Sequence, residues 1–377
     1  MPKRYNGEGT IYQRSNGLWV GEVTTGYATA ADGKVKRIKK SFSSMDREKL
    51  LKLVNDEKHR LDRNIITHSS DYTVSDWMAL WLTTYKLNHI KPKTYDNYDY
   101  AIRCHIRDAI GGVKLDKIRA EDIQRFYNQL LSRNLSSSTI NIVNVTLNQA
   151  FAQAVKLNLI YTNPCAAATV PKGYKKHVTA MSPDEQALLV SLCDGSTSRN
   201  FFIFLLNTGL RCGEALALTW EDINFEDKSI TVSKNVSTIK NRDASADAPR
   251  NITVISDTTK TASGNRTIPI NKHALRILSA QRDNPASDFF VFASRNGAVL
   301  THRNISRSFT GFIKSAGLPS KYSLHTLRHT FATRLLEKGV SPKVVSDILG
   351  HKSITITLNL YSHVMPSLKQ DAVDLLD

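Results

Sequence analysis

Cysteine is scarce in this chain, and its cysteines never stand as a C-x-x-C pair: Cys104, Cys165, Cys193 and Cys212. A zinc site built from thiolates is therefore not expected. Apolar runs are also short, and none approaches the roughly 20 residues of a membrane span. The first residues lack the apolar centre of a secretory signal, so we expect a cytoplasmic chain with free thiols.

Two motifs that handle nucleotides or metal ions are missing as well. The only Gly-Lys pair, Gly33-Lys34, is followed by Val35 rather than by Ser or Thr, so there is no Walker A loop. The zinc-protease pattern H-E-x-x-H is also absent. We therefore predict no cofactor and no metal ion.

Acidic residues are the third shortage. The chain has 34 Asp and Glu against 51 Lys and Arg, which gives a formal net charge of +17. This surplus indicates a polyanion or a membrane surface as partner. Because no membrane span is expected, nucleic acid is favoured. The length of 377 residues suits two or three domains, and 41% hydrophobic content is typical of folded ones.

Residues 1–66 are predicted to form a small β-sheet followed by one helix. Turn signals at Asn16-Gly17 and Asp32-Gly33 separate short β-type runs, and Ser44 stands where it could cap the helix. The third run carries a set of cations: Lys34, Lys36, Arg37, Lys39 and Lys40. Lysines can protect an edge strand from aggregation, or the strand can bind DNA, since a sheet fits the major groove. Composition alone leaves both interpretations open.

Residues 70–166 are predicted to be helical throughout. In the run TVSDWMALWLTTYKL, apolar and aromatic residues recur at helical spacing behind Thr73, which is in a capping position. The aromatic stripe indicates a packed core. The basic residues around the next helix, Lys91, Lys93 and Arg103, are either a solvated face or phosphate contacts, and the pattern does not decide between the two.

A linker at 170–177 leads to residues 175–377, which are predicted to mix helices with strands. The helices are expected at 183–194, 211–220, 325–337 and 342–349, and the strands between about 229 and 292. The fold class is therefore multidomain and mainly α, with small β-sheets. Four motifs in this segment concentrate Arg, Lys, His and Tyr: TGLRCGEALALTW, TKTASGNRTIPI, HTLRHTFAT and LGHKSITITLNLYSH.

Two arginines in these motifs are suited to a phosphodiester. Arg211 follows a Thr-Gly turn that leads into the helix of Glu214. His325 and Arg328 are three residues apart, so they share one face of a helix whose opposite stripe is apolar. A guanidinium grips phosphate oxygens bidentately and stays charged at any working pH. Two of them can neutralise the charge that builds on phosphate oxygens in a transition state.

The last motif adds a histidine and a tyrosine. His351 follows Gly350, a natural helix stop, and Tyr361 comes shortly after. A phenol, with a pKa of about 10, can attack phosphorus if a base takes its proton or cations stabilise the phenolate. A lysine near the leaving oxygen can donate a proton.

Together the four motifs resemble the tyrosine recombinase, or phage integrase, family. H-x-x-R alone occurs often by chance, but here four motifs stand in the family's order and at its typical separations. The resemblance covers the whole chain. Residues 1–66 look like the arm-type DNA-binding domain of conjugative-transposon integrases, residues 70–166 like the helical core-binding domain, and residues 175–377 like the mixed α+β catalytic domain.

The resemblance implies a role for each matched residue. Arg211 and Arg328 would clamp the scissile phosphate. Lys260, expected on a β-hairpin, would protonate the leaving 5′ oxygen. Residues 235–256 look like extra hairpin sequence that blurs the alignment here, and other lysines lie nearby: Lys234, Lys240 and Lys272.

The same resemblance places the remaining groups. His325 would handle the proton of Tyr361 and contact the phosphate, and His351 fills the second histidine position. Tyr361 would form the 3′-phosphotyrosine. Glu214 fits an acidic position that holds part of the arginine network. Two further histidines in the motifs are interpreted as structural: His329 and His363.

Local pattern and family disagree about the tyrosine segment. SITITLNLY alternates apolar and polar residues and is rich in β-branched types, which predicts a strand. The family places its tyrosine on a helix. We follow the family and expect a helix capped by Ser353, with tertiary packing overriding propensity.

The implied reaction is strand exchange by two transesterifications through a protein–DNA ester, which requires neither nucleotide nor metal. The expected partners are double-stranded DNA with core and arm-type sites, three further copies in a homo-tetramer on that DNA, and accessory excision or bending factors. The resemblance places the protein in a bacterial cytoplasm, associated with DNA and with no membrane partner.

Alternative functions are weighed against this one. A type IB topoisomerase uses similar chemistry, but the arm-type and core-binding segments argue against it. A DNA-binding regulator with a decayed active site is disfavoured because the whole residue set is present. A metal-dependent transposase would need carboxylates and divalent ions.

Overall fold

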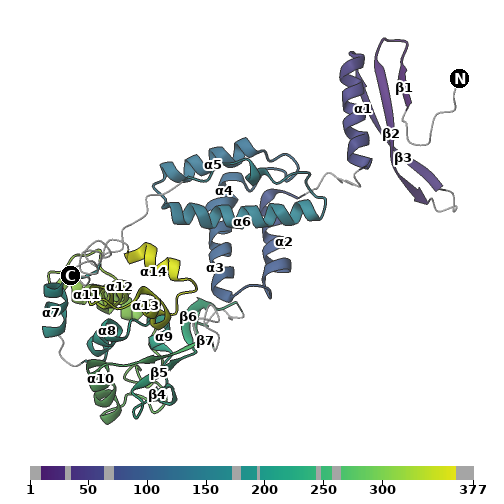
Figure 1. Cartoon of the computed structure of the whole chain (residues 1–377). Coiled ribbons are helices and arrows are strands. Elements are labelled where there is room, and N and C mark those ends of the chain that lie inside the picture. The colour runs from purple at the N-terminus through teal and green to yellow at the C-terminus, as the bar shows by residue number, and fades with distance from the viewer. Residues whose placement is uncertain are drawn as a thin grey trace, which may run out of the picture. The chain divides into compact units, whose positions relative to one another are not determined.

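The structure is a computed structural model that describes residues 10–29, 35–62, 72–171, 180–192, 196–242, 248–256 and 265–361. The chain divides into two compact units, Met1–Gly173 and Tyr174–Asp377, each taken by itself below (Figure 1). Helices predominate and the strands form small antiparallel sheets, which confirms the predicted fold class. Among the described helices, none combines the length and hydropathy of a membrane span.

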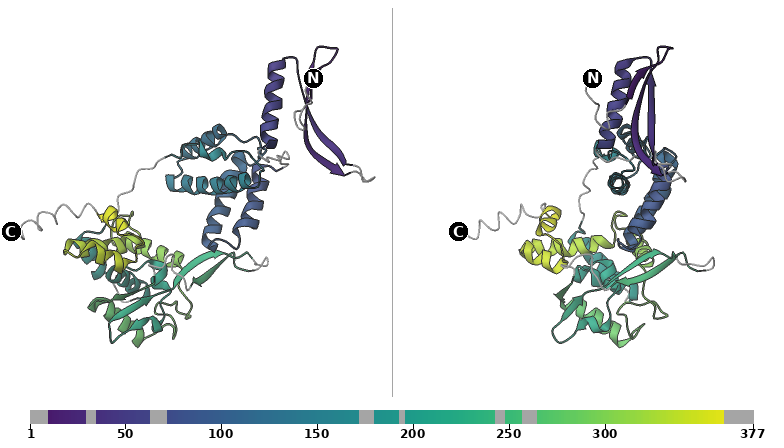
Figure 2. Two further views of the ribbon diagram at one scale, coloured as in Figure 1. Left: turned by 45° about the vertical axis from the view of Figure 1, so that its right-hand side comes forward. Right: turned by 90° about the vertical axis from the view of Figure 1, so that its right-hand side faces the viewer.

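The N-terminal part is a three-stranded antiparallel sheet with a helix on one face (Figure 2). Its elements are β1 (Thr10–Gln13), β2 (Trp19–Thr29), β3 (Val35–Ser44) and α1 (Arg47–Asp62). Val23 of the sheet packs against Leu50 and Val54 of the helix. A Cβ on Gly21 would lie 2.5 Å from Cγ2 of Val54, so glycine lets β2 approach α1 closely.

The start of α1 differs from the prediction. Asp46, and not Ser44, caps the helix: its Oδ1 accepts hydrogen bonds from the backbone N–H groups of Glu48 at 2.8 Å and Lys49 at 3.4 Å. Ser44 is the last residue of β3 and accepts from the N–H of Asp46. The strand therefore continues up to the residues that begin the turn into the helix.

The second part of this unit is helical, as predicted. Its elements are α2 (Val74–Trp81), η1 (Leu82–Lys86), α3 (Pro92–Ala101), η2 (Ile102–Ile106), α4 (Arg107–Ile110), α5 (Ala120–Ser132), α6 (Ser137–Lys156) and η3 (Pro164–Ala166). Thr73 caps α2 as expected, since its hydroxyl accepts from the N–H of Asp76 at 3.2 Å. η1 and η2 are π-helical turns, which the apolar spacing did not predict.

The aromatic stripe of this helical part is its core. Trp77 and Trp81 of α2 are buried together with Phe126, Tyr127 and Phe151. The indole N–H of Trp77 donates to the carbonyl of Ala150 at 2.9 Å, which ties α2 to α6. In Figure 1, α2 and α3 run side by side and α6 crosses both.

The second unit begins with helices and places its strands in the middle of its sequence. Its helices are α7 (Pro183–Ser191), α8 (Thr197–Thr208), α9 (Cys212–Leu216), η4 (Trp220–Asp222), α10 (Lys272–Asp283), α11 (His302–Ser315), α12 (Leu324–Glu337), α13 (Pro342–Leu349) and α14 (Ile354–Tyr361). Its strands are β4 (Ile223–Asn224), β5 (Ser229–Val232), β6 (Asn235–Lys240), β7 (Asn251–Ser256) and β8 (Arg266–Pro269).

The strands form two separate antiparallel sheets, ordered β4-β5-β8 and β6-β7. In the second, Asn235 pairs with Ser256 and Lys240 with Asn251, so residues 235–256 do contain the expected hairpin pairing. β6 packs beside α9, where a Cβ on Gly213 would lie 2.7 Å from the carbonyl of Val236.

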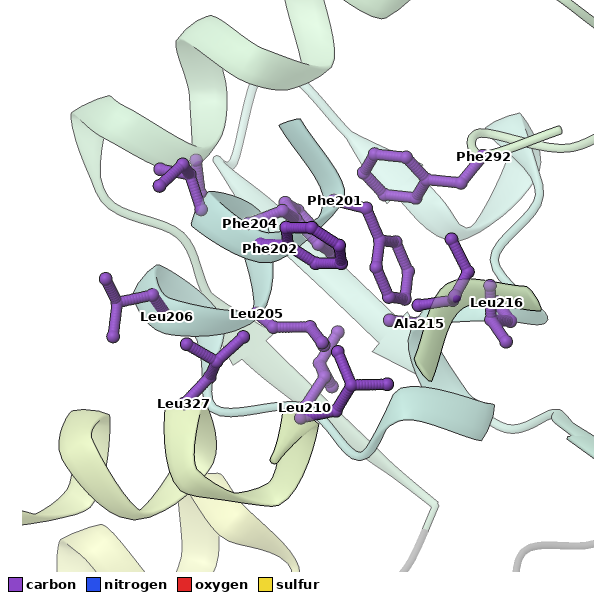
Figure 3. Close-up of a cluster of buried hydrophobic side chains, with 14 of the residues drawn as sticks. Phe201, Phe202, Phe204, Leu205, Leu206, Leu210, Ala215, Leu216, Phe292 and Leu327 are labelled. Atoms are coloured by element: carbon purple, nitrogen blue, oxygen red, sulfur yellow. The ribbon is translucent and has the colours of Figure 1, made fainter. Parts of the chain in front are cut away.

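The centre of this unit is α8, a helix that the pattern did not predict. Its apolar residues are buried all round, among them Phe201, Phe202 and Phe204, and Phe292 and Leu327 from distant segments pack against it (Figure 3). Residues 201–206 are apolar and buried without interruption, so this part of the helix shows no amphipathic periodicity. Because α8 is packed into the core, the turn that follows it at Gly209 is held in place.

That turn places the first site residue. α8 ends at Gly209, which adopts a left-handed conformation with φ of +64°. A Cβ there would also lie 2.4 Å from Cδ1 of Phe331 on α12. Both requirements select glycine. The chain therefore turns sharply and brings Arg211 to the start of α9.

Candidate active site

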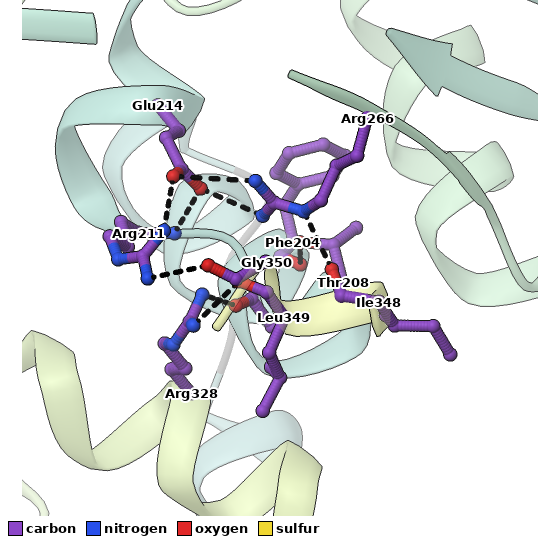
Figure 4. A network of polar contacts seen from close by, with 10 residues as sticks. Phe204, Thr208, Arg211, Glu214, Arg266, Arg328, Ile348, Leu349 and Gly350 are labelled. Atoms are coloured by element: carbon purple, nitrogen blue, oxygen red, sulfur yellow. Dashed lines mark hydrogen bonds and ion pairs between the residues drawn. The ribbon is translucent and has the colours of Figure 1, made fainter. Parts of the chain in front are cut away.

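Arg211 occupies the capping position of α9 and is held by Glu214 (Figure 4). Nη1 of Arg211 donates to Oε1 of Glu214 at 2.7 Å, and its backbone N–H donates to Oε2 at 3.0 Å. Nη2 donates to the carbonyl of Gly350 at 3.2 Å. The Arg211 side chain keeps 41% of its surface exposed while that of Glu214 keeps 4%, so the arginine can still reach a ligand.

Arg328 is buried, with 2% of its surface exposed. Its Nη1 donates to the carbonyl of Gly209 at 2.8 Å and its Nη2 to the carbonyl of Leu349 at 2.7 Å. These bonds join α12 to the end of α8 and the end of α13. The predicted pair of arginines is thus brought to one place, and its geometry depends on backbone carbonyls.

Arg266, on β8, is a member of this network that the sequence did not single out. Its Nη2 donates to Oε2 of Glu214 at 2.9 Å, and its Nε donates to the carbonyl of Ile348 at 2.7 Å. The Arg266 side chain is 8% exposed. Arg266 stands in the motif TKTASGNRTIPI, but nothing in the sequence indicates that it would contact Glu214 of α9.

Charge in the network is uneven. Burial by itself raises the pKa of the Glu214 carboxyl, but Arg266 and Arg211 outweigh it and hold that pKa below its ordinary value. The network therefore holds three guanidinium groups and one carboxylate, which contacts Arg211 and Arg266. The excess positive charge is what a phosphodiester requires.

Three histidines border these arginines. His325 and His329 lie on one face of α12, with ring centroids 4.4 Å apart and the rings nearly perpendicular. Burial lowers the pKa of His329 to about 3, and neighbouring positive groups add to the shift. His325 is exposed to solvent, yet the protein atoms packed around it lower its pKa, as do Arg328 and Arg211. Both rings are neutral near pH 7.

His351 joins the arginines to the tyrosine helix. It follows Gly350, which closes α13 in a left-handed conformation with φ of +65°. Nδ1 of His351 lies 2.8 Å from Oγ1 of Thr357, a buried residue of α14. Burial lowers the pKa of His351 to about 4, with further contributions led by Arg328 and Arg211.

The tyrosine segment is a helix, as the family resemblance predicted and periodicity did not. α14 ends at Tyr361, whose side chain is outside the described part of the structure. The hydroxyl of Ser353 accepts from the N–H of Thr355 at 3.2 Å, which confirms the cap. The three apolar side chains described in this helix are partly exposed: Ile354 by 38%, Ile356 by 41% and Leu358 by 40%.

Lys260 and His363 lie outside the described residues, so the structure does not place them. Lys260 belongs to the segment between β7 and β8. Of the nearby lysines, Lys234 has its Nζ 3.0 Å from Oδ2 of Asp222 and 3.0 Å from the hydroxyl of Thr219. Lys234 therefore stabilises the contact between its own segment and η4.

The candidate DNA-contact residues fall in the first unit. Lys39 pairs with Glu22 at 2.9 Å on the sheet face opposite α1, and Lys40 pairs with Glu57 of α1 at 3.0 Å. Lys36 and Arg37 lie on β3, without described side chains, and Lys34 is outside the described residues.

In the helical part, Lys91 and Lys93 stand exposed at the start of α3. Arg103, on η2, pairs with Asp99 at 3.1 Å and is 48% exposed. Within the described ranges, no group of His, Cys, Asp and Glu side chains is arranged to hold a metal ion.

The comparison with protein families agrees with this site. The model described as phage integrase family matches residues 180–367, and the phage integrase N-terminal SAM-like domain matches residues 73–131. The chain belongs to the phage integrase family and is a tyrosine site-specific recombinase.

Individual relatives are similar over most of the chain. The tyrosine recombinase XerC-like protein of Caldanaerobacter subterraneus subsp. tengcongensis is 29% identical over 330 residues, 81% of this chain and 83% of the relative. The ICEBs1 integrase of Bacillus subtilis is 26% identical over 301 residues, 76% of this chain and 78% of the relative.

Solved structures are similar too. The Tn1549 transposon integrase, in complex with a circular intermediate DNA, has a TM-score of 0.69 and 25% identity, over 81% of this chain and 100% of that chain. A lambda integrase tetramer bound to a Holliday junction has a TM-score of 0.61 and 22% identity, over 92% of this chain and 96% of that chain. The lambda similarity is one of fold.

Proposed function

We propose that this recombinase cuts DNA by attack of Tyr361 on a phosphodiester clamped by Arg211 and Arg328. The observation that carries the proposal is the meeting of both arginines at the C-terminal end of α13. From that end the chain runs through His351 directly into the helix that ends at Tyr361.

The cleavage step forms a bond between the phenolic oxygen of Tyr361 and phosphorus, and it breaks the bond to the 5′ oxygen. Arg211 and Arg328 stabilise the charge on the non-bridging oxygens. A neutral imidazole can accept the phenolic proton, which suits the lowered pKa of His325. His351 contacts the phosphate beside it, and Lys260 gives a proton to the leaving oxygen.

Rejoining reverses these events. The 5′ hydroxyl of the other duplex attacks the phosphotyrosine, and Tyr361 leaves and regains a proton. The energy of the broken phosphodiester is kept in the protein–DNA ester, so the exchange consumes no nucleotide. Glu214 does not react; it sets the orientation of Arg211.

We also propose the division of labour suggested by the sequence. Residues 1–66 bind arm-type sites, residues 70–166 bind the core site beside the catalytic residues 175–377, and four copies assemble on DNA with accessory excision or bending factors. Binding to DNA is supported by the Tn1549 integrase in its DNA complex, and a tetramer by the lambda integrase on a Holliday junction. Lys91, Lys93 and Arg103 would contact core-site phosphates.

Cleavage should persist in EDTA and without ATP, because protein side chains supply the charged groups. The measurement is covalent trapping on a nicked suicide substrate, whose 5′ fragment diffuses away after cleavage. We expect the same rate of adduct formation with and without Mg²⁺. A strict requirement for Mg²⁺ in adduct formation would contradict the proposal and favour a metal-dependent transposase.

Removing residues 1–66 should abolish binding to arm-type DNA and leave cleavage of a core site intact. A matched pair of variants of the full chain sharpens this test. Lys39→Gln, on the open face of the sheet, should weaken arm binding and lower the salt slope by about 1. Lys52→Gln, at an exposed position of α1 and outside the candidate DNA-contact residues, should leave that slope unchanged.

Filter binding of arm DNA across a range of salt concentrations measures both slopes. Loss of core cleavage from the folded truncation, or equal slopes for the two lysine variants and wild type, would contradict the assignment of the sheet to arm-type DNA.

A further inference from the structure

Three arginines donate to three consecutive carbonyls at the end of α13. Arg266 binds the carbonyl of Ile348, Arg328 that of Leu349 and Arg211 that of Gly350, at 2.7, 2.7 and 3.2 Å. Figure 4 shows the three guanidinium groups around this one turn of backbone. The last carbonyls of a helix have no partner within the helix and carry partial negative charge. The carbonyl groups at the end of α13 therefore fix the orientation of all three guanidinium groups.

Only two of these arginines are assigned to the phosphate. Arg266 is buried, as Arg328 is, and it differs from Arg328 in its partner: it shares the carboxylate of Glu214 with Arg211. Its guanidinium is bound on one edge by Glu214 and at Nε by the carbonyl of Ile348. These contacts are with the groups that also hold Arg211, namely Glu214 and the end of α13.

The carboxylate of Glu214 is shared between two arginines. Oε1 accepts from Nη1 of Arg211 at 2.7 Å and lies 3.4 Å from Nη1 of Arg266, while Oε2 accepts from Nη2 of Arg266 at 2.9 Å and from the backbone N–H of Arg211 at 3.0 Å. A carboxylate freed from Arg266 would be buried with a single arginine as counter-ion. A bidentate carboxylate–guanidinium pair is the strongest arrangement open to those two groups.

We propose that Arg266 is a positioning residue for DNA cleavage. Arg266 binds one oxygen of Glu214 and the carbonyl of Ile348 at the end of α13. The carboxylate therefore cannot form a bidentate pair with Arg211, and Arg211 keeps N–H groups available for the scissile phosphate. The inference rests on the proposed function, in which Arg211 clamps that phosphate. It assigns to Arg266 no contact with DNA.

The test compares adduct formation on the suicide substrate with DNA affinity. Arg266→Gln should slow adduct formation by about 100-fold, the size expected for losing one preorganised donor, while the Kd for core DNA stays within about threefold. Arg276→Gln, an exposed arginine of α10 outside the network, is the control for loss of one positive charge and should cleave at the wild-type rate.

A second substitution separates positioning from folding. Adding Glu214→Gln to Arg266→Gln removes the unshared negative charge but keeps an amide oxygen that can accept from Nη1 of Arg211. Arg211 is then still oriented but no longer held by a carboxylate, and the rate of adduct formation should recover by at least about tenfold. A purely structural role for Arg266 predicts the opposite, a double variant as slow as the single one or slower. The double variant also replaces a buried charge pair by neutral groups, which favours folding if the single variant does not fold.

Arg211→Lys in the same assay tests the phosphate clamp separately from the positioning role of Arg266. If Arg211→Lys cleaves normally, the proposed clamp is wrong. If it is defective while Arg266→Gln cleaves within twofold of wild type, or while the double variant shows no recovery, the role of Arg266 is wrong and the clamp stands.

Discussion

Tyr361→Phe should abolish the covalent protein–DNA complex and leave DNA affinity almost unchanged. The substitution removes one oxygen from a side chain at the end of α14 and keeps its ring. Loss of the nucleophile in an enzyme that depends on it costs at least about 10⁴-fold in rate. Trapping on a suicide substrate measures the adduct, and a gel shift measures the affinity.

The control for this variant is Tyr322→Phe in the same unit. The hydroxyl of Tyr322 donates to Oε2 of Glu185 at 2.7 Å, so its removal should cost about 1 kcal/mol of stability and spare cleavage. An adduct formed by Tyr361→Phe at a rate near that of wild type would remove Tyr361 from the role of nucleophile.

Arg211→Lys should lower the rate of cleavage by about 10²–10³-fold with only a modest loss of DNA binding. Arg211 binds Glu214 with Nη1 and the carbonyl of Gly350 with Nη2. A lysine ammonium keeps the charge but has no planar fork, so it cannot hold both groups and the phosphate in one geometry. Single-turnover cleavage at saturating protein measures the chemical step apart from binding.

Arg328→Lys should behave alike, because its two bonds to the carbonyls of Gly209 and Leu349 also require a fork. Arg276→Lys, exposed on α10, should retain the wild-type rate. Recombination by Arg211→Lys at the normal rate would exclude this arginine from the clamp.

The sequence predicted the polar part of the site better than the scaffold that carries it. Arg211, Glu214, Arg328 and His351 stand in ordered motifs, and the structure brings them together. The central helix α8 was missed because its residues 201–206 are all apolar and buried, so the stretch shows no alternation of polar and apolar faces. Arg266 was missed because its partnership with Glu214 joins segments that are distant in sequence, and no local pattern encodes it.

Two smaller differences have local causes. The β-branched run at 353–361 predicts a strand, yet it forms α14, where Ser353 caps the helix and Thr357 is buried next to His351. Tertiary contact outweighs a propensity difference of less than about 1 kcal/mol per residue. At α1 the cap moved to Asp46 because Ser44 is engaged in the strand β3, and sequence alone does not rank two polar residues so close together.

The exposed flank of α14 has a consequence for timing. Among its described side chains only Thr357 is fully buried, and three aliphatic residues keep about two fifths of their surface exposed, so the helix is packed less tightly than the core helices. Segments with few buried contacts open at a much smaller free-energy cost than the rest of a domain. The arginines at the end of α13 are held by hydrogen bonds to backbone carbonyls. The residues that bind the phosphate are therefore more rigid than the helix that carries the nucleophile. We therefore expect the arginines to be in position on bound DNA before the helix that carries Tyr361 is, so that delivery of the nucleophile is a step of its own.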